Sequence, residues 1–426
     1  MAGEPEERRE KRFSRRRLLG AAGIASAGAV VGGALGATRG PGSSSDDSGT
    51  SAALASAALS FYGVHQAGIA TPAQDRMVFA AFDVTASNAG ELREMLDRWT
   101  VASAAMAAGR QVADTEAEPL APPEDTGEAV GLPAAQLTVT VGFGPSLFDS
   151  RFGLGSRRPA KLVELPHFAG DQLDPQRSGG DICIQACAND PQVAFHAVRN
   201  LARLGRGTAA LRWLQLGFGR TSSTSTSQGT PRNLFGFKDG TNNIKAEDTA
   251  AMRDFVWVGT DSDQAWMAGG SYLVARRINM HIETWDRDSL RDQEDVFGRV
   301  KLTGAPLGMG HEFDTVDLAA ANPDGTMAVP ANAHIRLAAP ASNGGARILR
   351  RGYSFTDGIS EVTGDLEAGL FFICYQNDPE RQFIALQKRL AANDALNEYI
   401  VHTGSGIFAC PGGIAEGRSW SSPLFD

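Results

Sequence analysis

Two stretches of this chain repeat one sequence pattern, and the repeat restricts the possible folds. Asn-Asp-Pro occurs at 189–191 and again at 377–379, and Phe195 and Phe383 follow at the same spacing. Each triplet comes after an apolar run typical of a buried strand and before an amphipathic stretch. Aspartate at the N-cap and proline in the first turn are typical of a helix start. The pattern therefore predicts two strand–helix units, one in each of two similar halves.

The other apolar segments do not alternate strictly between strand and helix. Strands are expected at 77–84, 137–143, 182–188, 211–218, 271–283 and 370–376. Helices are expected at 89–107, 193–204, 287–299 and 383–396. This mixture favours an α+β fold with antiparallel sheets over a doubly wound parallel sheet.

The first 37 residues have the order of an export signal. A basic head ends in Arg15-Arg16-Arg17, and an uncharged run of 20 residues follows from Leu18 to Ala37. Adjacent arginines before such a run are typical of the twin-arginine route. The run is long enough to span a bilayer, but 13 of its residues are Gly or Ala, so an uncleaved anchor is the less favoured alternative. We expect export to a secreted or periplasm-like cell-envelope space, with membrane contact only during export.

The rest of the chain divides by composition and charge. Residues 38–60 predict a flexible tether, followed by halves at 61–228 and 229–426. The chain has a formal net charge of −9, and since residues 1–37 contribute +3, the remainder carries −12. An acidic protein lacks the basic surface that nucleic-acid binding needs, so no nucleic-acid partner is expected.

Cysteine spacing excludes two further classes of site. The four cysteines form no Cys-x-x-Cys and no Cys-x-x-Cys-His pattern, so neither a zinc ribbon nor covalent haem attachment is supported. Cys183 and Cys374 lie in apolar strand segments, where buried free thiols are expected.

An acid between two glycines stands at the start of the second half. Gly236-Phe-Lys-Asp-Gly240 places Asp239 in a tight turn, because glycine adopts backbone angles that other residues avoid. Taken alone, an Asp-Gly pair is better explained by a hairpin turn, for which it is a common signal. The turn directly follows the Ser/Thr-rich loop 221–230 between the halves, and ligand sites often form at such junctions.

Two histidines are candidate ligands for a metal cofactor. The twin-arginine route carries folded proteins, many with an inserted cofactor, so the signal itself hints at one. His334 stands in Asn332-Ala-His-Ile-Arg-Leu337, and His311 in Gly310-His-Glu-Phe-Asp314. A lone histidine is more often a hydrogen-bonded core or surface residue than an iron ligand, and chemistry alone leaves both candidates open.

A pair of arginines follows these histidines. Arg350 and Arg351 precede a Gly-Tyr turn. A surface salt bridge explains such a pair, but arginine is also the usual fixed positive charge beside an oxygen ligand.

Found in this order, the segments resemble the dye-decolourising peroxidases, in particular the exported deferrochelatase/peroxidase type. The resemblance covers nearly the whole chain after the signal, and Gly-Phe-Lys-Asp-Gly is the family's named motif. Its segments are 61–69, 141–144, 236–240, 333–337, 349–353 and 369–372. The resemblance implies two tandem ferredoxin-like halves with antiparallel sheets, arranged like a dimeric α+β barrel. It also implies one non-covalent haem b in the C-terminal half.

Residue roles follow from the same resemblance. His334 would be the proximal iron ligand, and its other ring nitrogen would need an acceptor that the sequence does not identify. Asp239 would move protons during peroxide reduction. Arg350 would stabilise charge separation as the O–O bond breaks and favour the ionised form of Asp239.

Four further residues complete the expected site. Asn243 would hold water or peroxide in place. The haem would also contact Arg350 and, through backbone groups near a propionate, Gly240, Thr241 and Asn242.

The implied activity is reduction of hydrogen peroxide with one-electron oxidation of dyes, phenols or other organic or metal donors. The alternative is haem-iron acquisition by release of iron from haem, with iron-uptake or copper/redox proteins as partners. A haem-binding module without activity would need neither Asp239 nor Arg350. The sequence is compatible with an oligomer. Bulky dyes do not fit a small pocket, so radicals at the surface are hypothesised on Trp257, Trp266, Trp285, Tyr353 or Tyr399.

Overall fold

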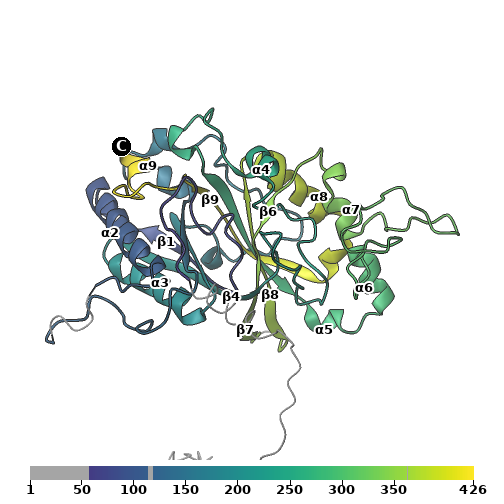
Figure 1. The fold of residues 1–426 in the computed structure, drawn as a ribbon. Helices are drawn as coiled ribbons and strands as arrows, with labels where there is room; N and C mark the ends of the chain where they lie inside the picture. Colours follow the sequence, from purple (N-terminus) through teal and green to yellow (C-terminus); the bar gives the residue numbers. More distant parts are fainter. Residues whose placement is uncertain (1–56, 114–118, 362) are drawn as a thin grey trace, which may run out of the picture. The chain divides into compact units, whose positions relative to one another are not determined.

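The computed structural model describes residues 57–113, 119–361 and 363–426 (Figure 1). The expected export signal at 1–37 and nearly all of the expected tether lie outside the described residues. Within the described part, no helix combines the length and the apolar character that a membrane span requires.

The strands form one antiparallel sheet that closes on itself. Its order is β5-β9-β2-β3-β1-β4-β7-β8-β6, and an additional pairing of β5 with β8 closes the sheet into a barrel. The strands are β1 (Arg76–Val84), β2 (Thr138–Phe143), β3 (Ile182–Ala188), β4 (Ala209–Arg220), β5 (Ser271–Met280), β6 (Leu349–Arg350), β7 (Tyr353–Ile359), β8 (Leu366–Gln376) and β9 (Ile400–Cys410). The expected α+β class with antiparallel, barrel-like sheets is confirmed.

Helices pack around this sheet in two groups. In Figure 1, α2 and α3 lie beside β1, whereas α7 and α8 lie at the opposite side, near β6. The helices are α2 (Ala89–Ala107), α3 (Pro191–Leu204), α4 (Thr249–Ala251), α5 (Ile282–Trp285), α6 (Leu290–Phe297), α7 (His334–Ala338), α8 (Ala385–Asn393) and α9 (Ser422–Phe425).

Both Asn-Asp-Pro triplets link a strand to a helix, as the repeat predicts. After β3, Asp190 accepts hydrogen bonds from the backbone N–H groups of Gln192 and Val193, and α3 begins at Pro191. After β8, Asp378 accepts from the N–H of Arg381, and a π-helical segment, Glu380–Ile384, leads into α8. Aspartate thus satisfies the free N–H groups of the first turn at both places.

The main apolar core lies between the first helices and the sheet. Trp99 of α2 is fully buried and packs its ring 5.1 Å from that of Phe82 on β1. All four cysteines are buried and unpaired, which confirms the expectation for Cys183 and Cys374.

The structure corrects the expected bounds of one strand and two helices. The strand expected at 271–283 ends at Met280, because the chain turns into α5, whose Trp285 is buried. The helix expected at 287–299 is shorter: Ser289 caps its start, and Gly298 ends it with a φ of +80°. The helix expected at 383–396 covers 385–393.

Candidate active site

A cavity of about 520 Å³ lies in the second part of the chain. All residues that line it fall between Asn233 and His402. Its walls come from β5, β8 and β9, from helices α7 and α8, and from the turn that carries Asp239. Small-molecule sites usually have volumes of roughly 300–1,000 Å³, so the cavity is large enough for a cofactor.

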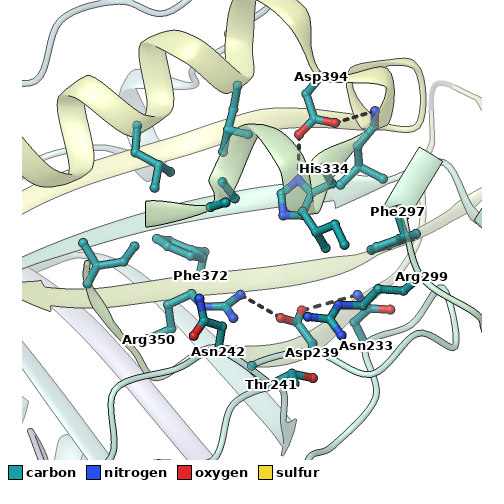
Figure 2. Close-up of a pocket in the computed structure, with 18 of the residues that line it drawn as sticks. Asn233, Asp239, Thr241, Asn242, Phe297, Arg299, His334, Arg350, Phe372 and Asp394 are labelled. Atoms are coloured by element: carbon teal, nitrogen blue, oxygen red, sulfur yellow. Dashed lines mark hydrogen bonds and ion pairs between the residues drawn. The ribbon is translucent and has the colours of Figure 1, made fainter. Parts of the chain in front are cut away.

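One wall presents a histidine whose ring is fixed from behind. His334 is the first residue of α7, and its Nδ1 lies 2.6 Å from Oδ2 of Asp394. The other carboxylate oxygen of Asp394 accepts a hydrogen bond from the N–H of Leu396. Figure 2 shows the second ring nitrogen of His334 pointing into the cavity. A histidine held in this way presents one oriented nitrogen to a metal.

The Asp394 contact also shifts the pKa of the His334 ring. Desolvation by burial lowers the pKa of His334, but the charge and hydrogen bond of Asp394 outweigh it, so the pKa is raised overall. Asp394 is the acceptor that sequence reasoning missed. It lies 60 residues from His334, at the end of α8, and no local pattern connects the two.

An acid and an arginine form the opposite wall. Arg350 donates from one guanidinium nitrogen to Oδ1 of Asp239 at 2.8 Å, and both side chains are largely buried. Asn233 donates to the other carboxylate oxygen at 3.3 Å. Figure 2 shows this group facing His334 across the cavity. The structure thus brings together His334, Asp239 and Arg350, which the sequence places far apart.

The Asp239 turn depends on its glycines and on Asn233. Gly236 and Gly240 have φ values of +82° and +84°, which agrees with the expected need for glycine. A Cβ at Gly240 would stand 3.0 Å from the backbone of Ser222. The side-chain oxygen of Asn233 accepts from the N–H groups of Phe235 and Phe237. The role of Asn233 in the site was also missed by sequence reasoning, although this residue lies only three positions before Gly236.

The rim of the cavity carries a second ion pair. Lys238 of the motif pairs with Glu312, which also accepts a hydrogen bond from Thr241. Burial raises the pKa of Glu312, but the hydrogen bonds from Lys238, Thr230 and Thr241 and the charge of Lys238 lower it by more, so Glu312 favours the ionised form. Arg299 donates to the backbone oxygen of Glu312 and lines the cavity. His311 is exposed and does not line the cavity, so the geometry favours His334 as the ligand.

Asn243 lies in a different place from the expected one. Gly240, Thr241 and Asn242 line the cavity, but Asn243 does not. Its amide donates to the backbone oxygens of Ser223 and Arg350 and accepts from the N–H of Arg350. Because both amide hydrogens are used behind the wall, the expectation that Asn243 holds water or peroxide does not fit this geometry.

Three of the five residues expected to carry surface radicals are not at the surface. Trp285, Tyr353 and Tyr399 are buried, because each packs within an apolar cluster of the second half or the barrel interior. Trp257 and Trp266 are half-buried, so only these two of the five are partly open to solvent.

The cavity fits a planar iron porphyrin. Its side walls include apolar residues of β5, β8, α7 and α8, which suit a flat hydrophobic ring: Ile278, Leu370, Phe372, Ile335 and Leu386. Histidine is a common axial ligand of haem iron, and His334 presents its free nitrogen into this space. A proton-transfer group and a fixed cation on the side opposite an iron ligand are the groups that peroxide reduction requires. The fold and the site therefore define a haem-dependent peroxidase.

Comparison with known proteins identifies the family. The sequence model for the N-terminal domain of Dyp-type peroxidases matches residues 66–219, and that for the C-terminal domain matches residues 230–415. This chain belongs to the Dyp-type peroxidase family, which confirms the resemblance, the fold, the haem cofactor and the enzyme class expected from the sequence.

Similar proteins come from several bacteria. A deferrochelatase of Escherichia coli K12 is 42% identical over 358 residues, covering 83% of this chain and 84% of the relative. One of Shigella flexneri is 39% identical over 412 residues, covering 96% and 95%. The oxyferrous complex of DtpA from Streptomyces lividans is 41% identical with a TM-score of 0.80, covering 88% of this chain and 99% of that structure. A DyP-type peroxidase from Cellulomonas bogoriensis is 38% identical with a TM-score of 0.78, covering 87% and 98%.

Replacing Asp394 by asparagine should weaken haem binding. Asparagine still accepts the hydrogen bond from Leu396, but it removes the negative charge beside His334. Loss of such a contact behind a metal ligand typically costs about 10–100-fold in affinity. Titration of the haem-free protein with haem, followed by absorption, measures this directly. Unchanged affinity together with an unchanged absorption spectrum would show that Asp394 does not support the ligand.

Proposed function

We propose that Asp239 and Arg350 carry out the peroxide chemistry of this peroxidase opposite His334. The observation that carries the proposal is the ion pair between them, in the cavity wall that faces His334. Bound haem would be held by His334 and would supply the iron and the oxidising equivalents for the reaction. The protein residues then manage protons and charge.

Asp239 is placed to move one proton twice. Its carboxylate accepts a proton from one oxygen of hydrogen peroxide and returns it to the departing oxygen, which leaves as water. The two contacts to Asp239, from Arg350 and Asn233, hold the carboxylate in one orientation in the wall. A fixed orientation matters because proton transfer requires hydrogen-bond distance to the reacting oxygen.

Arg350 supplies a permanent positive charge beside the reacting oxygens. Negative charge develops on the departing oxygen as the O–O bond breaks, and a preorganised cation stabilises it. The planar guanidinium of arginine also suits a fixed, oriented contact with oxygen atoms. The proposed donors are dyes, phenols and other organic or metal reductants, each giving up one electron at a time.

Replacing Asp239 by asparagine should lower the rate constant for reaction with hydrogen peroxide by about 10²–10⁴-fold, because no carboxylate remains to carry the proton. Stopped-flow absorption of the haem protein after mixing with peroxide gives this constant. Asp314→Asn is the matched control, since Asp314 also lines the cavity but bonds only to its own loop. Equal rates for wild type and Asp239→Asn would remove Asp239 from the mechanism.

A second candidate function is release of iron from haem. The observation that favours it is the name of the relatives from Escherichia coli and Shigella flexneri, deferrochelatase. Iron-uptake or copper/redox proteins would then be partners. With haem and a reductant but no peroxide, we expect iron-free porphyrin to appear by fluorescence, and His334→Ala to abolish it. Porphyrin that stays fully metallated would leave peroxidation as the function.

We also propose that residues 1–37 direct export by the twin-arginine route, with 38–60 as a tether before halves at 61–228 and 229–426. The support is the order of Arg15-Arg16-Arg17 and the uncharged run that follows. Replacing these arginines by lysines keeps the charge but should retain the protein in the cytoplasm, as cell fractionation would show. Normal export of the lysine variant would contradict this route.

A further inference from the structure

Five consecutive hydroxyl residues pass behind the wall that carries Asp239 and Arg350. The segment Thr221–Ser225, here called the hydroxyl floor, follows β4 and is buried throughout, at 0–4% exposure. The sequence suggested only a Ser/Thr-rich loop. Buried polar groups need hydrogen-bond partners, because an unpaired group costs free energy when it leaves water. The partners of the hydroxyl floor therefore indicate what it supports.

The hydroxyl floor contacts both chain segments of the cavity wall, the one that carries Asp239 and the one that carries Arg350. Thr221 donates its N–H to the backbone oxygen of Gly352, two residues after Arg350. Gly240, directly after Asp239, packs so closely on Ser222 that a Cβ there would lie 3.0 Å from the Ser222 backbone. The floor thus fixes the backbone next to the acid and next to the arginine.

Asn243 joins these two segments, bonding Arg350 through its side chain and Gly240 through its backbone. Its amide nitrogen donates to the backbone oxygen of Arg350 at 2.8 Å, and its amide oxygen accepts from the N–H of Arg350 at 2.7 Å. Its own N–H donates to the oxygen of Gly240 at 3.0 Å. Strand β6 is only two residues long and pairs with β8. The Asn243 amide therefore bonds both backbone groups of Arg350, in the manner of a neighbouring strand.

The hydroxyl floor in turn holds Asn243. The backbone oxygen of Ser223 accepts from the Asn243 amide at 3.1 Å and from Nζ of Lys245 at 2.8 Å. Nζ of Lys245 also donates to the Ser223 hydroxyl at 2.6 Å. Burial lowers the pKa of Lys245, and the nearby charge of Arg350 lowers it further. Through its two hydrogen bonds to Ser223, Lys245 holds the carbonyl to which Asn243 also donates.

We propose that Asn243, supported by Ser223 and Lys245, is a positioning residue that sets the distance between Asp239 and Arg350. The proposal rests on the proposed function of that pair. Asn243 does not line the cavity, so its side chain acts through the backbone of Arg350 rather than on peroxide. A displacement of about 1 Å at a reacting group can reduce a rate by about 10²-fold, so a backbone clamp of this kind affects the reaction.

The test is Asn243→Ala in the complete haem-loaded protein. We expect the rate constant for reaction with hydrogen peroxide to fall by about 10–100-fold. Haem content and the absorption spectrum of the resting protein should stay unchanged, because His334 and Asp394 lie on the other wall. A general loss of structure would instead lower haem content and peroxide reactivity together.

A double-mutant cycle separates positioning from a direct role. If Asn243 acts through Arg350, adding Asn243→Ala to an Arg350→Gln protein should lower the peroxide rate constant by less than about twofold. Effects that multiply fully in the double variant would overturn the proposal, since they would show that Asn243 acts independently of Arg350. Absence of any peroxide reaction in the wild-type protein would contradict the proposed function instead.

Ser225→Ala is the matched control within the hydroxyl floor. Ser225 is buried like Ser223 and donates to Glu247 at 2.5 Å, but no hydrogen bond joins its side chain to Asn243, Lys245 or Arg350. The rate constant of the Ser225→Ala protein for reaction with hydrogen peroxide should stay within about twofold of the wild-type value, because Ser225 is independent of the Asn243 contacts. An equal loss in Ser225→Ala and Asn243→Ala would overturn the proposal.

Lys245→Met is the second variant, and it decides the question if Asn243→Ala does not fold. It removes the ammonium group that holds Ser223 but leaves Asn243 in place. We expect a fall of about 3–10-fold in the peroxide rate constant, smaller than for Asn243→Ala because the clamp on Arg350 remains. A wild-type rate in a haem-loaded Lys245→Met protein would contradict the proposed support.

Discussion

The pairing of β8 on both of its edges is the constraint on which the cavity depends. One edge pairs with β5 over eight positions and closes the barrel, whereas the other pairs with β7 and with the short β6. Leu370 and Phe372 of β8 therefore form part of the cavity wall next to Arg350, which β6 brings to the same strand. The chain then runs from β8 into α8 and reaches Asp394, behind His334. One strand thus links the two walls of the haem site.

A shared principle governs the polar residues of the site. Two of the polar side chains that face the cavity are each held by a second residue: His334 by Asp394, and Asp239 by Asn233. Arg350 is bonded through its backbone to Asn243. Because charged groups inside a protein are costly unless they are paired and hydrogen-bonded, these supports stabilise the walls as well as orient them. The positions of the three polar groups thus depend on the neighbouring residues that bond to them.

The sequence predicted the features that leave a local pattern. The Asn-Asp-Pro repeat gave both strand–helix units, and the glycines around Asp239 gave the turn. Contacts between distant segments left no such pattern, so Asp394 was missed and Asn243 was expected on the wrong side of the wall. Strand β9 was not expected either, since Gly404 and Gly406 interrupt its apolar run. At Gly404 a Cβ would stand 2.6 Å from the backbone oxygen of Arg177. The glycine is therefore required by a contact between distant segments, which the sequence does not reveal.

The buried cysteines have a consequence for an enzyme whose substrate is an oxidant. Thiols react with peroxide mainly as thiolates, and only where peroxide reaches them. All four cysteines are enclosed, and burial raises the pKa of Cys183, Cys374 and Cys410, which keeps these thiols protonated. The same packing that fills the barrel therefore shields its most oxidisable atoms from the compound that the haem site consumes. Direct oxidation of these thiols by peroxide is therefore disfavoured at each turnover.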